Sequence, residues 1–251
     1  MRKPRPLSSL ALSLFLLAGV PLAGCTQEVS RMDPELAAQA FPGNAGMAEL
    51  AAAVRSGNVD EVKRLAPAVD LDAKGDRDVT LLQWAILNRQ QETFAALLDA
   101  GANPSIAGLG QHSAWHTAAR ADSPVFLEAL LQRDKRIDLP HAATAETPLA
   151  SAVTAGYRDN VDLLLTAGAD IDAVDRMGNT ALHAAGKTGD ASLALLLLEA
   201  GARSDLRNDQ DRTFDHYLFL MDTEFLTTHA RSEMEKVRAL LPAHGDTDSD
   251  I

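Results

Sequence analysis

Residues 175–202 read DRMGNTALHAAGKTGDASLALLLLEAGA, and this stretch predicts one helix–turn–helix unit. Asp175 and Gly178 favour a tight turn, because glycine accepts a positive φ and aspartate can hydrogen-bond its own backbone. Thr180 is expected to cap a first helix through its hydroxyl. His183, three residues later, is expected to return a hydrogen bond in the manner of a capping box. The first half of the stretch therefore predicts a turn followed by a capped helix.

The second half predicts another helix. Gly189 is a helix stop, the leucine-rich residues 192–199 form the second helix, and Gly201 closes it. Two helices this short cannot bury their apolar faces alone, so the unit requires neighbours of the same kind.

The same marks recur along the chain with a period of 33 or 34 residues. The paired leucines of the second helix return at 97–98, 130–131, 164–165 and 197–198. The capping position is held in turn by Thr80, Ser113, Thr147, Thr180 and Thr213. A period near 33 that carries T-x-L-H-x-A belongs to the ankyrin pattern, which residues 47–241 resemble. The best matches are Thr147-Pro148-Leu149 and Thr180-Ala181-Leu182-His183.

This resemblance implies an all-α fold, an ankyrin-repeat solenoid of about six helix–turn–helix repeats with degenerate terminal caps. The repeats are expected near residues 47–75, 76–107, 108–141, 142–174, 175–207 and 208–242, the last with an insertion at 222–231. In repeat two, Gln83 replaces the histidine of the pattern, and Arg89 replaces the mid-repeat glycine. Trp84 is expected to fill the core rather than contact a partner. Ser113 is the expected cap of repeat three, and Asp134 replaces its closing glycine.

Residues 1–24 read as a lipoprotein signal peptide. Three basic residues precede an apolar run at 7–22 that is short for a membrane span. The run ends Leu22-Ala23-Gly24-Cys25, which resembles a bacterial lipobox and implies lipidation of Cys25. With Thr26 following it, the resemblance implies an outer-membrane lipoprotein that faces the periplasm. An uncleaved signal anchor and a fortuitous cysteine are the alternatives.

Residues 25–46 are predicted to be the lipidated cysteine and a tether. Asp33-Pro34 suits a helix start, but a flexible spacer is the preferred prediction. Residues 243–251 are predicted to be an acidic disordered tail. Cys25 is the only cysteine in the chain, so no disulfide is expected.

The charge balance is acidic. The net charge is −12, and a chain without residues 1–24 would lose three of its 23 basic side chains and none of its 35 acidic ones, for a net charge of −15. A surface this acidic repels phosphate backbones, which argues against nucleic-acid binding.

No metal, cofactor or catalytic site is predicted. His112 and His116 are four residues apart but lack the glutamate of H-E-x-x-H. His116, His183 and His216 share one phase of the repeat, and we expect each to bond backbone of its own or a neighbouring repeat. A hydrolase that uses His216, Asp215, His229 and the insertion at 222–231 is the weaker alternative.

The resemblance implies partner contacts at the variable positions around T-P-L-H-x-A-A, on the concave face of the stack. The predicted contact residues are Asp76, Arg77, Val79, Asn88, Leu109, His112, Arg120, Thr144, Glu146, Arg176, Met177, Asn179 and Lys187. The charge cluster at 133–136 is a further candidate contact patch. The leading hypothesis is a monomeric, non-enzymatic lipoprotein that touches the membrane through its lipid anchor only and binds an unidentified protein, with a toxin and an envelope enzyme as candidates. The alternative is an immunity protein that neutralises a toxin acting in the periplasm.

Overall fold

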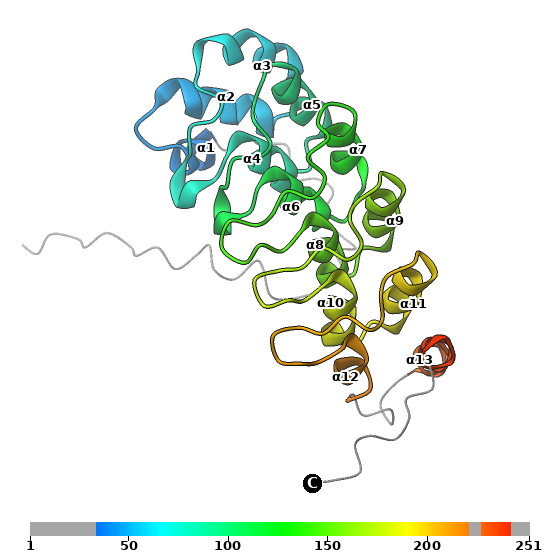
Figure 1. The fold of residues 1–251 in the computed structure, drawn as a ribbon. Coiled ribbons are helices and arrows are strands. Elements are labelled where there is room, and N and C mark those ends of the chain that lie inside the picture. Colours follow the sequence, from blue (N-terminus) through cyan, green and yellow to red (C-terminus); the bar gives the residue numbers. More distant parts are fainter. Residues whose placement is uncertain (1–33, 221–226, 242–251) are drawn as a thin grey trace, which may run out of the picture. The chain divides into compact units, whose positions relative to one another are not determined.

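The computed structural model describes residues 34–220 and 227–241 of the chain. In this part, successive helix pairs stack so that first helices contact first helices and second helices lie along the other side (Figure 1). The first helices are α2 (Ala45–Arg55), α4 (Leu81–Leu87), α6 (Ala114–Ala119), α8 (Pro148–Ala155), α10 (Ala181–Thr188) and α12 (Phe214–Leu218). The second helices are α3 (Val59–Leu65), α5 (Gln91–Asp99), α7 (Val125–Leu131), α9 (Arg158–Thr166), α11 (Ala191–Glu199) and α13 (Thr228–Leu240). The described ranges contain no strand, and the predicted all-α repeat fold is confirmed.

Helix starts follow the predicted capping positions, but two of the five hydroxyls make no capping bond. Thr180 accepts from the backbone N–H of His183 at 3.3 Å, and the N–H of Thr180 donates to Nδ1 of His183 at 3.2 Å, which completes the capping box. Ser113 stands at the equivalent position before α6, but its hydroxyl makes no capping bond to the helix backbone. It pairs with Nδ1 of His116 at 2.8 Å instead. The prediction of a hydroxyl cap is therefore confirmed for Thr180 and wrong for Ser113. It is also wrong for Thr213, whose hydroxyl donates to the carboxylate of Asp215.

The break between the two helices contains a left-handed residue in repeats one, two, four and five, while the break of repeat three, with Asp122 at this position, has none among the described residues. Gly156 and Gly189 adopt φ values of 78° and 70° after α8 and α10. Arg89 takes the same place after α4 with a φ of 58°. A side chain in this region costs about 1 kcal/mol relative to glycine, so the turn geometry is kept in repeat two at some expense in stability.

The core runs continuously through the stack. The first leucine of each predicted pair is fully buried, at positions Leu97, Leu130, Leu164 and Leu197. Trp84 is also buried: its Nε1–H donates to the carbonyl oxygen of Ala51 at 2.9 Å, and its ring meets that of Phe41 edge-on. The core interpretation of Trp84 is confirmed.

The first of two corrections to the predicted domain boundaries concerns the tether. Helix α1 (Pro34–Ala40) packs against α2, and the side chains of Ala37 and Phe41 are buried. These two apolar residues are four apart and therefore lie on the same side of the chain. With them, α1 covers the N-terminal end of repeat one, which would otherwise face solvent. Residues 34–46 therefore belong to the folded cap and not to a spacer. The predicted signal peptide and Cys25 lie outside the described residues.

The second correction concerns the predicted insertion. Helix α13 begins at Thr228, so residues 228–231 form its first turn, while residues 222–226 lie outside the described part, as does the predicted tail at 243–251. Helix α13 packs against α11 and buries Met234 and Val237. It therefore caps the last repeat, whereas Leu240 is exposed.

Across residues 34–220 and 227–241, no helix has both the length and the apolar content needed to cross a membrane.

Candidate functional site

A side chain three residues after the cap ties each of three repeats to the next. Gln83 donates from Nε2 to the carbonyl oxygen of His112 at 3.0 Å. Nε2 of His116 donates to the carbonyl oxygen of Glu146 at 2.9 Å, and Nε2 of His183 to that of Arg212 at 3.0 Å. Each accepting carbonyl directly precedes the next cap. We call each of these inter-repeat hydrogen bonds a rung. The prediction that His116 and His183 bond neighbouring backbone is confirmed.

The rung histidines are neutral. A carbonyl oxygen only accepts, so Nε2 carries the hydrogen and Nδ1 is left to accept from the cap residue. Burial lowers the pKa of His116 to about 4, with the neighbouring His112 and His141 acting in the same direction. Burial also lowers the pKa of His183, and Lys187 adds to the effect. Both rings therefore serve as fixed hydrogen-bond donors near neutral pH.

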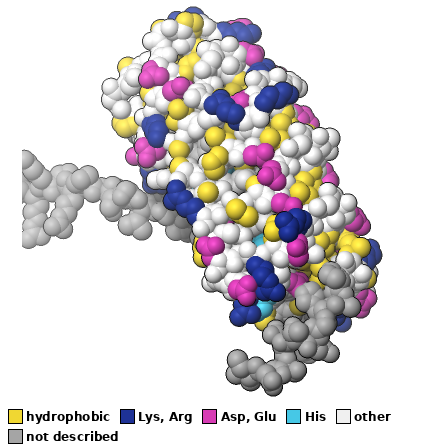
Figure 2. All heavy atoms as spheres, viewed as in Figure 1, with side chains coloured by type: hydrophobic (Ala, Val, Ile, Leu, Met, Phe, Trp, Pro, Cys, Tyr) yellow, Lys and Arg dark blue, Asp and Glu magenta, His cyan; other side chains and the backbone are white. Residues whose placement is uncertain are grey.

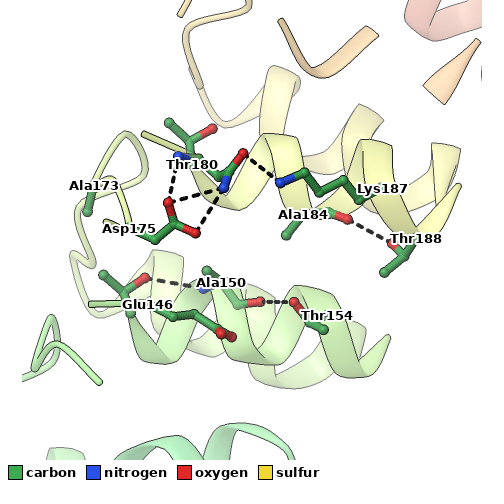
Figure 3. Close-up of a pocket in the computed structure, with 11 residues that line it drawn as sticks. Glu146, Ala150, Thr154, Ala173, Asp175, Thr180, Ala184, Lys187 and Thr188 are labelled. Carbon is green, nitrogen blue, oxygen red and sulfur yellow. Dashed lines mark hydrogen bonds between the residues drawn. The ribbon is translucent and has the colours of Figure 1, made fainter. Parts of the chain in front are cut away.

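Repeat four lacks its rung because Ala150 occupies the position of Gln83, His116 and His183. Within the described ranges, the carbonyl oxygen of Asn179 accepts only from the N–H of Asp175, at 2.9 Å. A cleft of about 170 Å³ lies between α8 and α10 at this point. Figure 3 shows Ala150 facing α10 across the cleft, with Thr154 and Thr188 toward one end. The lining residues are Glu146, Thr147, Ala150, Thr154, Ala173, Asp175, Asn179, Thr180, Ala184, Lys187 and Thr188.

The charged groups of the cleft are two carboxylates and one ammonium. Oε1 of Glu146 accepts from the hydroxyl of Ser151 at 2.7 Å. Oδ1 of Asp175 accepts from the backbone N–H of Asn179 at 2.8 Å, and its carboxylate also accepts from the Asn179 side chain. Nζ of Lys187 donates to Oδ1 of Asn179 at 2.6 Å and lies 5.1 Å from the centre of the Tyr217 ring. The cleft thus carries a net negative charge, with its ammonium already engaged.

The predicted contact residues divide by exposure. The exposed ones are Asp76, Arg77, Arg120, Thr144, Arg176, Met177 and Lys187, and the half-buried ones are Asn88, Leu109, His112 and Glu146. Val79 belongs to the core, and Asn179 is buried, with its side chain bonded to Asp175, Lys187 and Asn208. Neither Val79 nor Asn179 offers a side chain to a partner, so their assignment as contacts is wrong.

The exposed residues lie mainly at turn tips. Asp76 and Arg77 belong to the short 3₁₀ helix η2 (Asp76–Asp78), which contacts η3 (Leu109–Gln111) of the next repeat. We call the turn tips, together with the exposed side of the first helices, the turn-tip face. Glu146, Asn179 and Lys187 are brought together in the cleft on this face. Figure 2 shows charged side chains of both signs scattered over the visible surface, with hydrophobic side chains between them.

Two features of the site could not be predicted from the sequence pattern. The first is the cleft itself, which is open because the side chain of Ala150 is small. The second is a histidine cluster: the ring of His141 is tilted against that of His112, with ring centres 4.5 Å apart, and its centre lies 5.6 Å from that of the His116 ring. The phase of His141 differs from that of the rung histidines, so the repeat pattern gives no signal for this cluster. Nε2 of His141 donates to the carbonyl oxygen of Gly110 at 3.1 Å, and its Nδ1 accepts from Thr144.

Metal-binding geometry is not found in the part of the chain that the structure describes, where no group of three His, Cys, Asp or Glu side chains is placed to hold an ion. In the charge cluster at 133–136, Arg133 bonds Asp99 at 2.7 Å, and Arg136 bonds Asp134 at 3.0 Å. These two arginines are engaged within the fold, and the side chain of Lys135 is exposed.

The residues of the hydrolase alternative have local contacts. The ring of His216 packs edge-on against Tyr217, with Arg212 3.4 Å from its Nδ1. The carboxylate of Asp215 accepts from the hydroxyl of Thr213. His229 is exposed on α13.

Known proteins share both the sequence pattern and the fold. A family model described as ankyrin repeats (3 copies) matches residues 115–208. Protein PhlB of Serratia liquefaciens is 41% identical over 177 residues, which cover 70% of this chain and 78% of that protein. A putative palmitoyltransferase, ZDHHC13 of Danio rerio, is 30% identical over 141 residues, which cover 55% of this chain but only 22% of that protein. The crystal structure of EF0377, an ankyrin repeat protein, superposes with a TM-score of 0.64 at 24% identity and covers 76% of this chain and 96% of that chain.

Proposed function

This chain belongs to the ankyrin-repeat proteins, whose fold is a protein-interaction module, and we propose that it captures a protein partner through the turn-tip face of repeats four and five. The ankyrin-repeat fold is generally a non-catalytic scaffold. Capture without chemistry is accordingly the proposed activity.

One observation carries this proposal: the tip of repeat five presents exposed side chains on a fixed backbone. The side chain of Met177 is 52% exposed. Its N–H donates to Oδ1 of Asp175 at 2.8 Å, and its carbonyl oxygen accepts from the N–H of Asp209 at 2.9 Å. The N–H of Arg176 donates to the carbonyl oxygen of Thr144 at 2.8 Å. A backbone held on both sides loses little conformational freedom on binding, which favours affinity.

The test is capture of the partner from envelope extracts by the soluble chain from residue 26 onward. We expect Arg176→Glu combined with Met177→Asp to abolish capture while the circular dichroism spectrum and melting temperature stay unchanged. Lys63→Glu on α3, away from the turn tips, is the matched charge control and is expected to retain capture. Equal capture by the double variant and the wild type would contradict the proposed face.

We further propose that Cys25 is lipidated and anchors the chain in the bacterial outer membrane, facing the periplasm. The order of basic residues, apolar run, small residues and cysteine over residues 1–25 supports this proposal. Cys25→Ser is expected to move the protein from the membrane fraction to the soluble fraction. Membrane retention of the serine variant would argue for an uncleaved signal anchor instead.

A toxin is the second candidate partner, which would make this chain an immunity protein. The net charge of −12 favours it, because an acidic surface attracts and can mask a basic catalytic cleft. Deletion of the gene is expected to sensitise the cell to a secreted effector encoded nearby. Unchanged survival in the presence of every such effector would remove this candidate. A hydrolase remains the weaker alternative, and an activity abolished by His216→Ala would favour it.

A further inference from the structure

We propose that the cleft at Ala150 is a recognition slot for an arginine side chain supplied by the partner. This inference deepens the proposed function and rests on it.

The first step is the backbone acceptor. At Gln83, His116 and His183, a planar group with an N–H donor fills the equivalent space and bonds the carbonyl before the next cap, at 2.9 to 3.0 Å. At Ala150 the space is open, and in the described chain the carbonyl oxygen of Asn179 keeps the single bond from Asp175. A carbonyl oxygen has two lone pairs. The fold therefore offers a preformed acceptor for a planar N–H donor that the chain does not supply.

The second step is charge. Glu146 and Asp175 outnumber Lys187 among the charged residues that line the cleft. The ammonium of Lys187 is drawn to Asn179 Oδ1 and the Tyr217 ring. Oε1 of Glu146 bonds Ser151, while its Oε2 has no hydrogen-bond partner in the described part. Among planar donors, a guanidinium suits a carboxylate and a carbonyl together, because it carries five N–H groups in a fixed fork.

The third step is the wall of the slot. Ala150, Ala173 and Ala184 contribute methyl groups to the lining. The hydroxyls of Thr154 and Thr188 donate to carbonyl oxygens of their own helices, at 2.8 and 3.0 Å, and so are already satisfied (Figure 3). These side chains make an apolar wall for the aliphatic stem of arginine, whose methylenes pack on such surfaces while the head stays polar.

The experiment measures binding of N-acetyl-arginine amide to the soluble chain by amide chemical-shift changes. The neutral isostere N-acetyl-citrulline amide is the ligand control. We expect the arginine probe, and not the citrulline probe, to shift the amides of Ala150, Thr154 and Lys187 in a saturable way. Glu146→Gln is expected to weaken binding about tenfold, because a charge-assisted bond becomes neutral, whereas Glu128→Gln on α7 is the matched control and leaves it unchanged.

Ala150→His supplies the missing rung and should abolish probe binding. Its melting temperature shows that the variant is folded, and Glu146→Gln tests the slot without filling it. The inference is overturned if the arginine probe causes no shifts, if citrulline binds equally well, or if Ala150→His binds the arginine probe like the wild type. Partner capture reports separately on the proposed function. If Ala150→His captures the partner normally, the partner does not use the slot, and only the inference fails. If the tip variant Arg176→Glu with Met177→Asp captures normally while the probe still binds, only the proposed face fails.

Discussion

His183 and Arg212 are joined across a repeat boundary by a hydrogen bond of 3.0 Å from the imidazole Nε2 to the backbone carbonyl oxygen. The same ring accepts at Nδ1 from the N–H of Thr180, at 3.2 Å. One neutral side chain therefore caps its own helix and fastens it to the next repeat. Local and long-range order are coupled at this residue.

Replacing His183 tests this coupling. His183→Ala leaves the Thr180 N–H without its partner and the Arg212 carbonyl with only the bond from the N–H of Asn208. An unsatisfied buried group of this kind costs about 1–3 kcal/mol. His183→Gln should cost less than His183→Ala, because Gln83 performs both tasks in repeat two, capping Thr80 and bonding His112. Guanidinium unfolding gives the free energies. Equal losses for the two variants would mean that the ring acts by packing alone.

Ala150→His is expected to stabilise the chain. The new imidazole would reach the carbonyl oxygen of Asn179 and fill the cleft, and one net hydrogen bond is worth about 0.5–1.5 kcal/mol. The melting temperature measures the gain. Ala150→Leu is the control, since it fills the space without a donor and should gain less. A histidine variant less stable than the leucine variant would show that the rung geometry cannot form there.

Stability should fall as the pH falls from about 6.5 to 4. Burial lowers the pKa of His116 to about 4 and also lowers the pKa of His112, so the unfolded chain binds these protons first. Stability is thus full above the unfolded pKa of about 6.5 and is lost below it. Protonation disfavours the folded form by about 3 kcal/mol for His116 alone over this window. Thermal unfolding from pH 7.5 to 4 measures the slope.

The control for the pH effect is His116→Gln. Glutamine keeps an N–H donor for the carbonyl oxygen of Glu146 but does not titrate. The variant should lose much of the pH dependence. If the stability of this variant depended on pH as steeply as that of the wild type, the pH dependence would come from other groups.

Gly186→Ala should weaken the contact between α10 and α12. A Cβ at Gly186 would lie 2.3 Å from the carbonyl oxygen of Phe214, so the two helices must separate. Overpacking of this kind costs about 1–3 kcal/mol. Thr188→Ala, at an exposed position of the same helix, is the matched control. Chemical denaturation compares the two. A Gly186→Ala variant as stable as the control would mean that α12 shifts freely on α10.

Periodic residues made most of the fold predictable. Thr180, Gly189 and the leucine pairs act through local rules of capping, turn geometry and burial, so the sequence alone places them. The N-terminal cap was missed because α1 is held by tertiary contacts of Ala37 and Phe41 with the neighbouring helix, which helix propensity does not reveal.

The candidate site was only partly predictable. The positions of the exposed tip residues can be predicted from their place in the 33-residue repeat. Val79 and Asn179 occupy similar places in the repeat but are buried. The cleft depends on the absence of a side chain at Ala150, and its meaning requires knowing what Gln83, His116 and His183 reach. A sequence shows the alanine but not the carbonyl left opposite it.

The rungs also give the stack a direction. Each donor sits in one repeat and each acceptor in the following one, so the two ends of the array are chemically different. Ala51, six residues before the left-handed Gly57, stands at the first rung position and has no donor in its side chain, while His216 stands at the last, and the chain continues into α13. A copy of residues 175–207 inserted after residue 207 would find a carbonyl waiting ahead of it and a donor behind it. The same copy placed before α1 would have no rung donor behind it, so a duplicated repeat gains rungs on both sides only inside the array.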